Sequence, residues 1–275
     1  MNTSTATAAL VDLLDEPYPL TQDQIAAYRR DGYIKLRGVF DAGTLERYGS
    51  RIRAVVAEKA KNLPPLHERD TYGKAFQQIF NLWLEDAEIR RFVFSKRLAR
   101  IATELMGTRG VRMYHDQALF KEPGGGFTPW HADQQYWPLS SEHSITAWIP
   151  LQATPVEMGP LQFAIGSHRI HVGRDLEISD ESEQLIGRTM KDFPKDETPF
   201  ELGEVSFHAG WTMHRAGPNN TDRMRAVMTV IYIDIDMRMS VPKNSNQARD
   251  AERWCPGIKP GELIASPINP PMYER

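Results

Sequence analysis

The sequence predicts a mostly β protein with flanking α-helices, in which N-terminal helices support a β-barrel or sandwich core. Three observations predict this fold class. Helical patterns dominate the chain up to about residue 107. Short β-like segments separated by glycine and proline clusters follow them. The 275 residues are enough for one buried core, so we expect a single domain over 1–275.

Local signals place the first elements. Residues 1–18 are small, polar and acidic, and we expect them to be frayed. Thr21 and Gln24 have the spacing of a capping box, which predicts a helix that ends at Gly32. Residues 33–36 then form a short predicted strand.

Further helices, strands and insertions are predicted along the rest of the chain. Asp41 is expected to cap a helix over 43–61, and another helical pattern covers 86–106. The β-like segments are Val111–Lys121, Ser144–Leu151, Leu161–Ala164, Glu204–His208 and Arg225–Asp234. Two polar stretches, 171–200 and 240–262, interrupt them. Insertions in a β-barrel run over its surface and often cover a site, so we expect lids here.

Composition excludes several classes of protein. The chain is 41% hydrophobic and 25% charged, and its formal net charge of -3 argues against a nucleic-acid partner. No apolar run approaches the roughly 18 residues of a membrane span, and no signal-peptide pattern is present. The lone Cys255 rules out an internal disulfide and a cysteine-built metal site. We expect a cytoplasmic protein without membrane partners; the oligomeric state is not predicted.

The segment from Thr128 to Gln134 carries the candidate chemistry. It contains His131 and Asp133, and residues i and i+2 of a strand point to the same side of a sheet. An imidazole and a carboxylate can therefore be directed at one point. A pair of this kind often arises by chance, and an isolated one is more often a surface hydrogen bond than a metal site.

Three further features favour a metal site. His214 follows at the end of another β-like run, and it completes the set of two histidines and one carboxylate that is typical of non-haem Fe(II) oxygenases. Arg225 opens the next run, where a hairpin would return it beside His214. Its planar guanidinium matches a carboxylate in two hydrogen bonds. The Gly124–Gly126 loop suits a place where the backbone must bend sharply.

At these residues the sequence resembles the phytanoyl-CoA dioxygenase family of Fe(II)/2-oxoglutarate oxygenases. The resemblance spans nearly the whole chain, from the Leu20–Gly32 helix and the strand after it to Arg225. It is carried by Leu119-Phe120-Lys121-Glu122-Pro123, Trp130-His131-Ala132-Asp133, Trp148-Ile149-Pro150-Leu151, Gly159-Pro160-Leu161, Gly166-Ser167-His168 and His214 through Asn219. It implies a double-stranded β-helix core, of the jelly-roll or cupin-like kind, with a helical N-terminal buttress.

The resemblance also implies roles for individual residues. The family's iron ligands correspond to His131, Asp133 and His214, and the co-substrates would be 2-oxoglutarate and O₂. Residues matching its 2-oxoglutarate contacts are Arg225 for the distal carboxylate, with Lys121 and Trp148, and Gln117 by strand parity with Lys121. Family members often have Ser at the position of Ala216, so one hydrogen bond to the co-substrate is expected to be missing or replaced.

Other side chains near these motifs have simpler interpretations. His208 and His115 lie in β-like runs, and we expect them to be hydrogen-bonded structural residues. The aromatic residues around the iron motifs are expected to pack in the core rather than to contact substrate; they are Trp130, Tyr136, Trp137 and Trp211.

Two alternatives to hydroxylation of a small-molecule metabolite stay open at this stage. The same site could catalyse desaturation, epoxidation or ring formation, because these outcomes differ in substrate placement rather than in ligands. The other alternative is a non-catalytic β-barrel that binds a metal or ligand. The complete ligand set and Arg225 argue against it.

Overall fold

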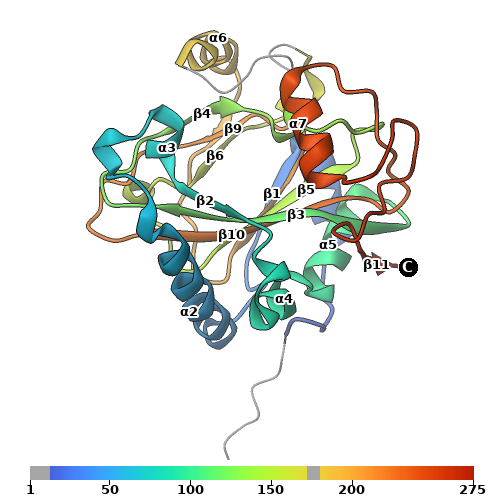
Figure 1. Ribbon diagram of the computed structural model, residues 1–275, viewed down its shortest axis with the longest axis horizontal. Helices are drawn as coiled ribbons and strands as arrows, with labels where there is room; N and C mark the ends of the chain where they lie inside the picture. Colours follow the sequence, from blue (N-terminus) through green and yellow to red (C-terminus); the bar gives the residue numbers. More distant parts are fainter. Residues whose placement is uncertain (1–12, 172–179) are drawn as a thin grey trace, which may run out of the picture.

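The structure, a computed structural model, describes residues 13–171 and 180–275. Within them, two antiparallel β-sheets stack against each other and helices pack around the pair (Figure 1). The larger sheet has the strand order β1-β8-β5-β10-β3-β11, with β2 also paired to β3, and the smaller has the order β4-β9-β6-β7. This arrangement is a jelly-roll, so the predicted fold class is confirmed.

The strand bounds agree closely with the β-like segments of the sequence. The larger sheet contains β1 (Tyr33–Leu36), β2 (Gln77–Phe80), β3 (Gly110–Lys121), β5 (Ser144–Pro150), β8 (Val205–Ala209), β10 (Arg225–Asp234) and β11 (Pro271–Glu274). The smaller sheet contains β4 (Thr128–His131), β6 (Leu161–Ala164), β7 (Lys195–Asp196) and β9 (His214–Ala216). The predicted bounds of β6 and β10 are confirmed at both ends.

Seven α-helices lie in the described part of the chain. They are α1 (Gln22–Asp31), α2 (Ala42–Lys59), α3 (Thr71–Ala75), α4 (Ala87–Val93), α5 (Lys96–Met106), α6 (Asp180–Met190) and α7 (Ser245–Trp254). The prediction of one helix over 86–106 was wrong. The chain breaks at Ser95, whose hydroxyl accepts from Leu98 N and so begins α5 as a new helix.

Both ends of α1 follow its local sequence signals. Thr21 and Gln24 form the predicted capping box, each side chain accepting from the other residue's backbone N–H. Gly32 ends the helix with φ 82°, a left-handed conformation that glycine adopts freely. A Cβ at this position would lie only 2.3 Å from His168 Nδ1. The absence of a side chain at Gly32 therefore lets His168 pack closely against the end of the helix.

Strand β10 shows how the larger sheet separates the core from the site. Its side chains alternate between two faces. Ala226, Met228 and Val230 join the main hydrophobic core, to which α2, α4 and α5 contribute from outside the sheet. Arg225 and Thr229 point the other way and line a cavity between the sheets.

The segments predicted as lids carry helices. Within 171–200, residues 172–179 lie outside the described part of the chain, and α6 packs through Ile186 and Met190 in one cluster with Trp130. Within 240–262, α7 lies beside the cavity. Whether either segment moves during the reaction stays a prediction.

The described part of the N-terminal segment is tied to the core. Residues 1–12 lie outside the described part, but residues 13–18 are not frayed as predicted. Leu14 is fully buried, and its carbonyl accepts hydrogen bonds from Ser95 Oγ and Arg97 N. The burial of Leu14 explains why this short acidic stretch is ordered.

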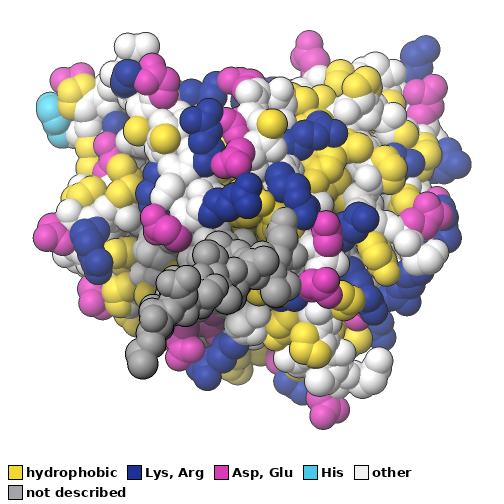
Figure 2. Space-filling model, turned by 90° about the horizontal axis from the view of Figure 1, so that it is seen from below, with side chains coloured by type: hydrophobic (Ala, Val, Ile, Leu, Met, Phe, Trp, Pro, Cys, Tyr) yellow, Lys and Arg dark blue, Asp and Glu magenta, His cyan; other side chains and the backbone are white. Residues whose placement is uncertain are grey.

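Two surface features bear on partners. Among the described residues, no helix is both long enough and apolar enough to cross a bilayer. The face in Figure 2 carries basic and acidic side chains interspersed with each other, rather than one basic field.

Candidate active site

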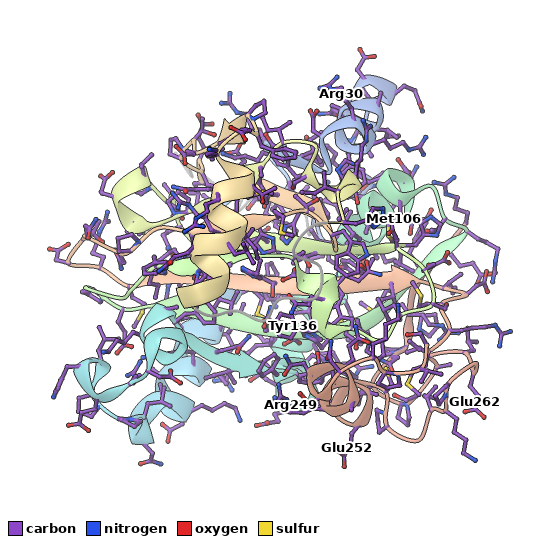
Figure 3. All side chains as sticks on the ribbon, turned by 90° about the horizontal axis from the view of Figure 1, so that it is seen from above. Arg30, Met106, Tyr136, Arg249, Glu252 and Glu262 are labelled. Atoms are coloured by element: carbon purple, nitrogen blue, oxygen red, sulfur yellow. The ribbon has the colours of Figure 1, made fainter. Side chains whose placement is uncertain are left out.

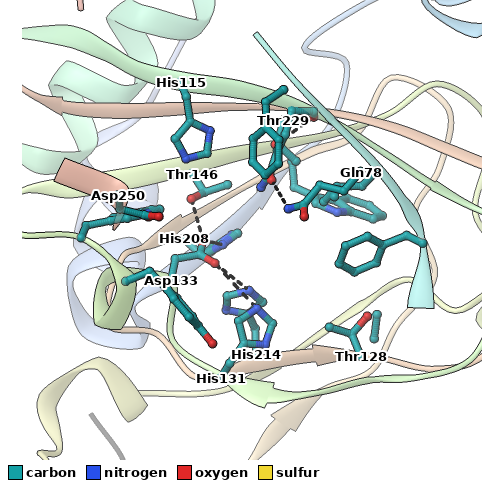
Figure 4. A pocket seen from close by; sticks show the side chains of 18 of the residues that line it. Gln78, His115, Thr128, His131, Asp133, Thr146, His208, His214, Thr229 and Asp250 are labelled. Carbon is teal, nitrogen blue, oxygen red and sulfur yellow. Dashed lines mark hydrogen bonds and ion pairs between the residues drawn. The ribbon is translucent and has the colours of Figure 1, made fainter. Parts of the chain in front are cut away.

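A cavity of about 390 Å³ lies between the two sheets (Figure 4). Alternate residues of β3, β5 and β10 form one wall, and residues of β4, β6 and β9 form the wall opposite. Nearly all of the residues predicted to act at a site line this cavity, namely Gln117, His131, Asp133, Trp148, His214 and Arg225.

His131, Asp133 and His214 come together in this cavity. His131 ends β4, His214 begins β9, and the two are direct partners in the antiparallel pair. Asp133 Oδ1 lies 3.7 Å from His131 Nε2 and 3.6 Å from His214 Nε2. Two atoms that each bind one ion at about 2.1 Å lie no more than about 4.2 Å apart. Both distances to Asp133 meet this limit, and the ligand atoms of all three side chains lie within 4.8 Å of one another, so the group could hold a metal ion (Figure 4).

The backbone at Asp133 differs from the prediction. Strand β4 ends at His131, and Asp133 opens a 3₁₀-helix over Asp133–Tyr136. Ala132 between them is still extended, with φ -120° and ψ 130°. The alternation of side chains thus persists one residue beyond the strand. His131 and Asp133 face the same side, although the strand assignment of Asp133 was wrong.

Backbone carbonyls select the tautomers of both histidines. Nδ1 of His131 lies 2.8 Å from Pro129 O, and Nδ1 of His214 lies 2.9 Å from Thr212 O. Because a carbonyl only accepts, each Nδ1 carries the proton and each Nε2 keeps a lone pair for a metal. Burial lowers the pKa of His214 to about 4, so this imidazole is neutral near pH 7, as a metal ligand must be.

Asp133 is held through its second carboxylate oxygen. Oδ2 accepts from Thr146 Oγ1 at 2.8 Å and lies 3.2 Å from His208 Nε2. Burial alone would raise the pKa of Asp133, but the neighbouring histidines, His214 first, outweigh it and hold that pKa well below its usual range. The group is an ionised carboxylate whose Oδ1 faces the two Nε2 atoms.

The structure confirms His208 as a buried, hydrogen-bonded residue and places it at the cluster, a position that the sequence did not predict. Its ring is buried between His214, 4.4 Å away by ring centroids, and Phe163, 5.5 Å away. Its Nδ1 has no hydrogen-bond partner within 13–171 and 180–275, so its polar contact is with Asp133. The sequence Val-Ser-Phe-His over 205–208 indicates this position, because apolar and polar residues alternate and the polar ones share the face of the strand that carries His208.

We expect His208→Phe and Thr146→Val each to weaken Fe(II) binding by about 10- to 100-fold, the usual cost of removing a partner of a metal ligand. Each change roughly preserves volume but removes the group that contacts Asp133 Oδ2. Anaerobic Fe(II) titration of the purified variants measures the effect. His208→Gln and Thr146→Ser keep a donor and should recover most of the affinity. Equal losses in all four variants would show that packing, not hydrogen bonding, is responsible.

Arg225 and Lys121 form a pair of buried basic side chains. They are direct partners on β10 and β3. Arg225 is 1% exposed, and its Nε has no hydrogen-bond partner among the described residues. Burial lowers the pKa of Arg225 to about 9. Burial, together with repulsion from the positive charge of Arg225, lowers the pKa of Lys121 to about 6. Near pH 7 Lys121 is therefore mostly neutral, whereas Arg225 remains a buried cation without an ion pair in the described part of the chain, which suits an anionic ligand such as a carboxylate.

The other predicted co-substrate contacts differ in their positions. Trp148 packs with its ring 5.7 Å from the Arg225 guanidinium, and its Nε1 is buried without a hydrogen-bond partner in the described residues. Gln117 Oε1 accepts from Gln78 Nε2 at 2.6 Å. Lys121 is not among the described residues that line the cavity. Its Nζ instead donates to the carbonyls of two loop glycines, Gly126 and Gly217.

Arg225 reaches the cavity by a different route from the predicted hairpin. β9 pairs with β4 and β6, whereas β10 pairs with β3 and β5 in the other sheet. Arg225 and His214 therefore face each other across the cavity instead of lying in paired strands. Ala216, where a serine hydroxyl was noted as missing, is buried in the same lining.

Curated proteins with related sequences are oxygenases. A probable alpha-ketoglutarate-dependent hypophosphite dioxygenase of Stutzerimonas stutzeri is 24% identical over 227 residues, covering 78% of this chain and 79% of that protein. An ectoine dioxygenase of Sphingopyxis alaskensis is 24% identical over 245 residues, covering 82% of this chain and 79% of that protein.

Solved structures share the fold. The non-haem alpha-ketoglutarate-dependent epimerase SnoN from nogalamycin biosynthesis superimposes with a TM-score of 0.73 at 26% identity, covering 91% of this chain and 98% of that one. The sequence model of the phytanoyl-CoA dioxygenase family matches residues 28–227. This protein therefore belongs to the phytanoyl-CoA dioxygenase family, as the resemblance of its motifs implied.

Proposed function

We propose that this member of the family, a non-haem Fe(II)- and 2-oxoglutarate-dependent dioxygenase, binds its iron through His131, Asp133 and His214. The observation that carries this proposal is the convergence of two Nε2 lone pairs and one carboxylate oxygen in the cavity. The hypophosphite dioxygenase and the epimerase SnoN are both described as alpha-ketoglutarate-dependent, and SnoN has been crystallised with Fe3+ and alpha-ketoglutarate, which supports this proposal.

The chain's own residues would bind and orient the reactants. When bound, Fe(II) and 2-oxoglutarate supply the activation of O₂, and 2-oxoglutarate leaves as succinate and CO₂. Arg225 would hold the distal carboxylate through its planar guanidinium, with Trp148 and Gln117 lining the same region. Because Ala216 offers no hydroxyl, Arg225 would carry more of that interaction.

We propose that the substrate is a small organic molecule and that hydroxylation is the outcome. The relatives named for hypophosphite, methylphosphonate and ectoine act on small molecules. A cavity of about 390 Å³ also suits a ligand of that size beside the co-substrate. Neighbours of the same fold are described as an epimerase and a carbocyclase, so substrate placement decides the outcome.

The reaction can be tested before the substrate is known. We expect the purified protein to convert 2-oxoglutarate slowly to succinate in air when Fe(II) and ascorbate are supplied, because such turnover needs the metal site and co-substrate alone. Succinate quantified by mass spectrometry gives the rate, with a chelator-treated sample as the control. Equal succinate with and without the chelator would contradict iron dependence. Wild-type protein that binds Fe(II) yet never binds 2-oxoglutarate would contradict the co-substrate assignment.

A further inference from the structure

Helix α7 presents a stripe of polar side chains to the cavity. The stripe consists of residues spaced three and four apart, which share one face of a helix: Asn246, Arg249, Asp250 and Arg253. Figure 3 shows Arg249 and Glu252 leaving the helix in different directions. Asn246 is buried and Asp250 is half-buried, whereas Arg249 and Arg253 are exposed and lie at the mouth of the cavity, where a ligand entering from solvent would meet their charges.

The helix is fixed beside the iron-binding cluster. Gln247 Nε2 donates to the carbonyl of Gln135 at 3.0 Å, and Gln135 lies in the 3₁₀-helix that begins with Asp133. The stripe therefore faces the part of the cavity next to Asp133. Figure 4 shows Asp250 and His115 on one side of the cluster and Thr128 on the other.

This part of the cavity is separated from Arg225 along the sheet. On β10, Arg225 pairs with Lys121, whereas Ile231 pairs with His115 and Thr146. The intervening strand spans roughly 20 Å at about 3.4 Å per residue. A ligand held by the α7 stripe would thus not compete with a carboxylate held by Arg225.

Aromatic rings form the remaining walls of this region, and two of them, Tyr136 and Trp137, also pack in a hydrophobic cluster as predicted. Phe80, Tyr136, Trp137 and Trp254 all line it. The Arg253 guanidinium lies 4.3 Å from the Phe80 ring centroid and 4.4 Å from that of Trp254, so cation–π contacts orient it. Arg249 donates a hydrogen bond to Asn246 Oδ1 within the stripe, and both arginines interact electrostatically with Asp250.

The charge balance of the region is positive near neutral pH. Burial raises the pKa of Asp250 to about 7 against the opposing effect of both arginines, so this acid is only partly ionised there. Burial also lowers the pKa of His115 to about 4, which leaves its imidazole neutral. The His115 ring stacks on Trp254 at 4.6 Å, and its buried Nδ1 lacks a hydrogen-bond partner within the described residues. Apart from Asp133, whose negative charge is proposed to bind the iron, Arg249 and Arg253 therefore carry the full charges at this end of the cavity lining.

We infer that the α7 stripe is the substrate-recognition surface, that Arg249 and Arg253 bind an anionic group, and that the substrate is an organic anion with an apolar or flat body. A carboxylate or a phosphonate would satisfy the guanidinium donors, and the aromatic walls would cover the body. His115 and Asp250 would contact a neutral polar group nearer the iron ligands. This inference rests on the proposed function, in which Arg225 is reserved for 2-oxoglutarate.

Three probes with one ring and different charges test it: phenylacetate, 2-phenylethanol and phenethylamine. The anaerobic enzyme loaded with Fe(II) and 2-oxoglutarate is titrated with each, and tryptophan fluorescence gives the dissociation constant because Trp137 and Trp254 line the region. We expect phenylacetate to bind about tenfold more tightly than the alcohol, and the amine to bind most weakly. Raising the salt concentration should reduce that preference.

The variants assign the preference to particular side chains. Arg249→Gln combined with Arg253→Gln should remove the preference for phenylacetate. Arg223→Gln removes the same charge from an exposed residue outside the cavity lining and should leave the preference unchanged. Equal binding of the three probes, or a preference that survives the double substitution, would overturn the inference. Failure of the proposed function is distinct, since the wild-type protein would then fail to bind 2-oxoglutarate before any probe is added.

Discussion

Alanine at His131, Asp133 or His214 is expected to abolish both Fe(II) binding and 2-oxoglutarate consumption, while the protein stays folded. Each residue supplies one of the three donor atoms that converge in the cavity. A metal site loses affinity sharply when a direct ligand is removed, and here two donors would remain. The measurements are iron content after anaerobic reconstitution, succinate formation, and circular dichroism to verify the fold.

The matched control is His67→Ala, because the His67 side chain is 80% exposed and lies far from the cavity lining. It should retain full iron content and turnover. If purified His214→Ala consumed 2-oxoglutarate at the wild-type rate, the ligand set would be wrong. Loss of the native circular dichroism spectrum in all three variants would mean that the cluster is needed for folding, which contradicts the expectation.

Arg225→Met is expected to change co-substrate binding and protein stability in opposite directions. Arg225 is buried without an acidic partner in the described residues, and replacing such a charge by an apolar side chain of similar size is commonly neutral or stabilising by about 1–4 kcal/mol. The pKa of Arg225 is lowered to about 9 in the folded protein, below its value in an unfolded chain. The cost of burying the charge is therefore present in full at pH 7 and declines only above about 9.

Binding should respond in the other direction. Removing one partner of a buried charge pair costs on the order of 3–5 kcal/mol, which corresponds to roughly a 100- to 3,000-fold weaker dissociation constant. Thermal unfolding with and without 2-oxoglutarate measures both effects. The wild-type protein should gain stability on adding 2-oxoglutarate, Arg225→Met should not, and Arg223→Met, the exposed control, should behave as the wild type. An unchanged gain in Arg225→Met would show that another residue holds the distal carboxylate.

The parts of the site that the sequence predicted are those set by local patterns. The two-residue spacing of His131 and Asp133 survives because Ala132 stays extended beyond the end of β4. Arg225 was predicted correctly as a residue of β10, where alternation alone decides which side chains face the cavity. The capping box of Thr21 likewise determined where α1 begins, since it needs no tertiary contact.

The parts that were missed depend on contacts between distant segments. A histidine in a strand has the same local sequence whether it packs in the core or lies beside a candidate metal ligand. The positions of His208 and His115 in the cavity lining therefore could not be predicted from the sequence. Helix α7 was taken as a polar insertion because few of its residues are apolar; of its buried side chains, Asn246 and Gln247 are polar and only Trp254 joins a hydrophobic cluster. Residues 13–18 were predicted to be frayed because the burial of Leu14 depends on contacts with the distant residues Ser95 and Arg97.

The placement of α7 outside both sheets, between β10 and β11, has an evolutionary consequence. The candidate iron ligands and Arg225 all come from the sheets or the turn at the end of β4, whereas the proposed recognition stripe comes from one ten-residue helix near the C-terminal end of the described chain. Substitutions on that helix alter side chains that the strand pairings do not use. The molecule is thus modular: selection could exchange one substrate for another within α7, at little risk to the folding of the sheets or to the oxidative chemistry they support.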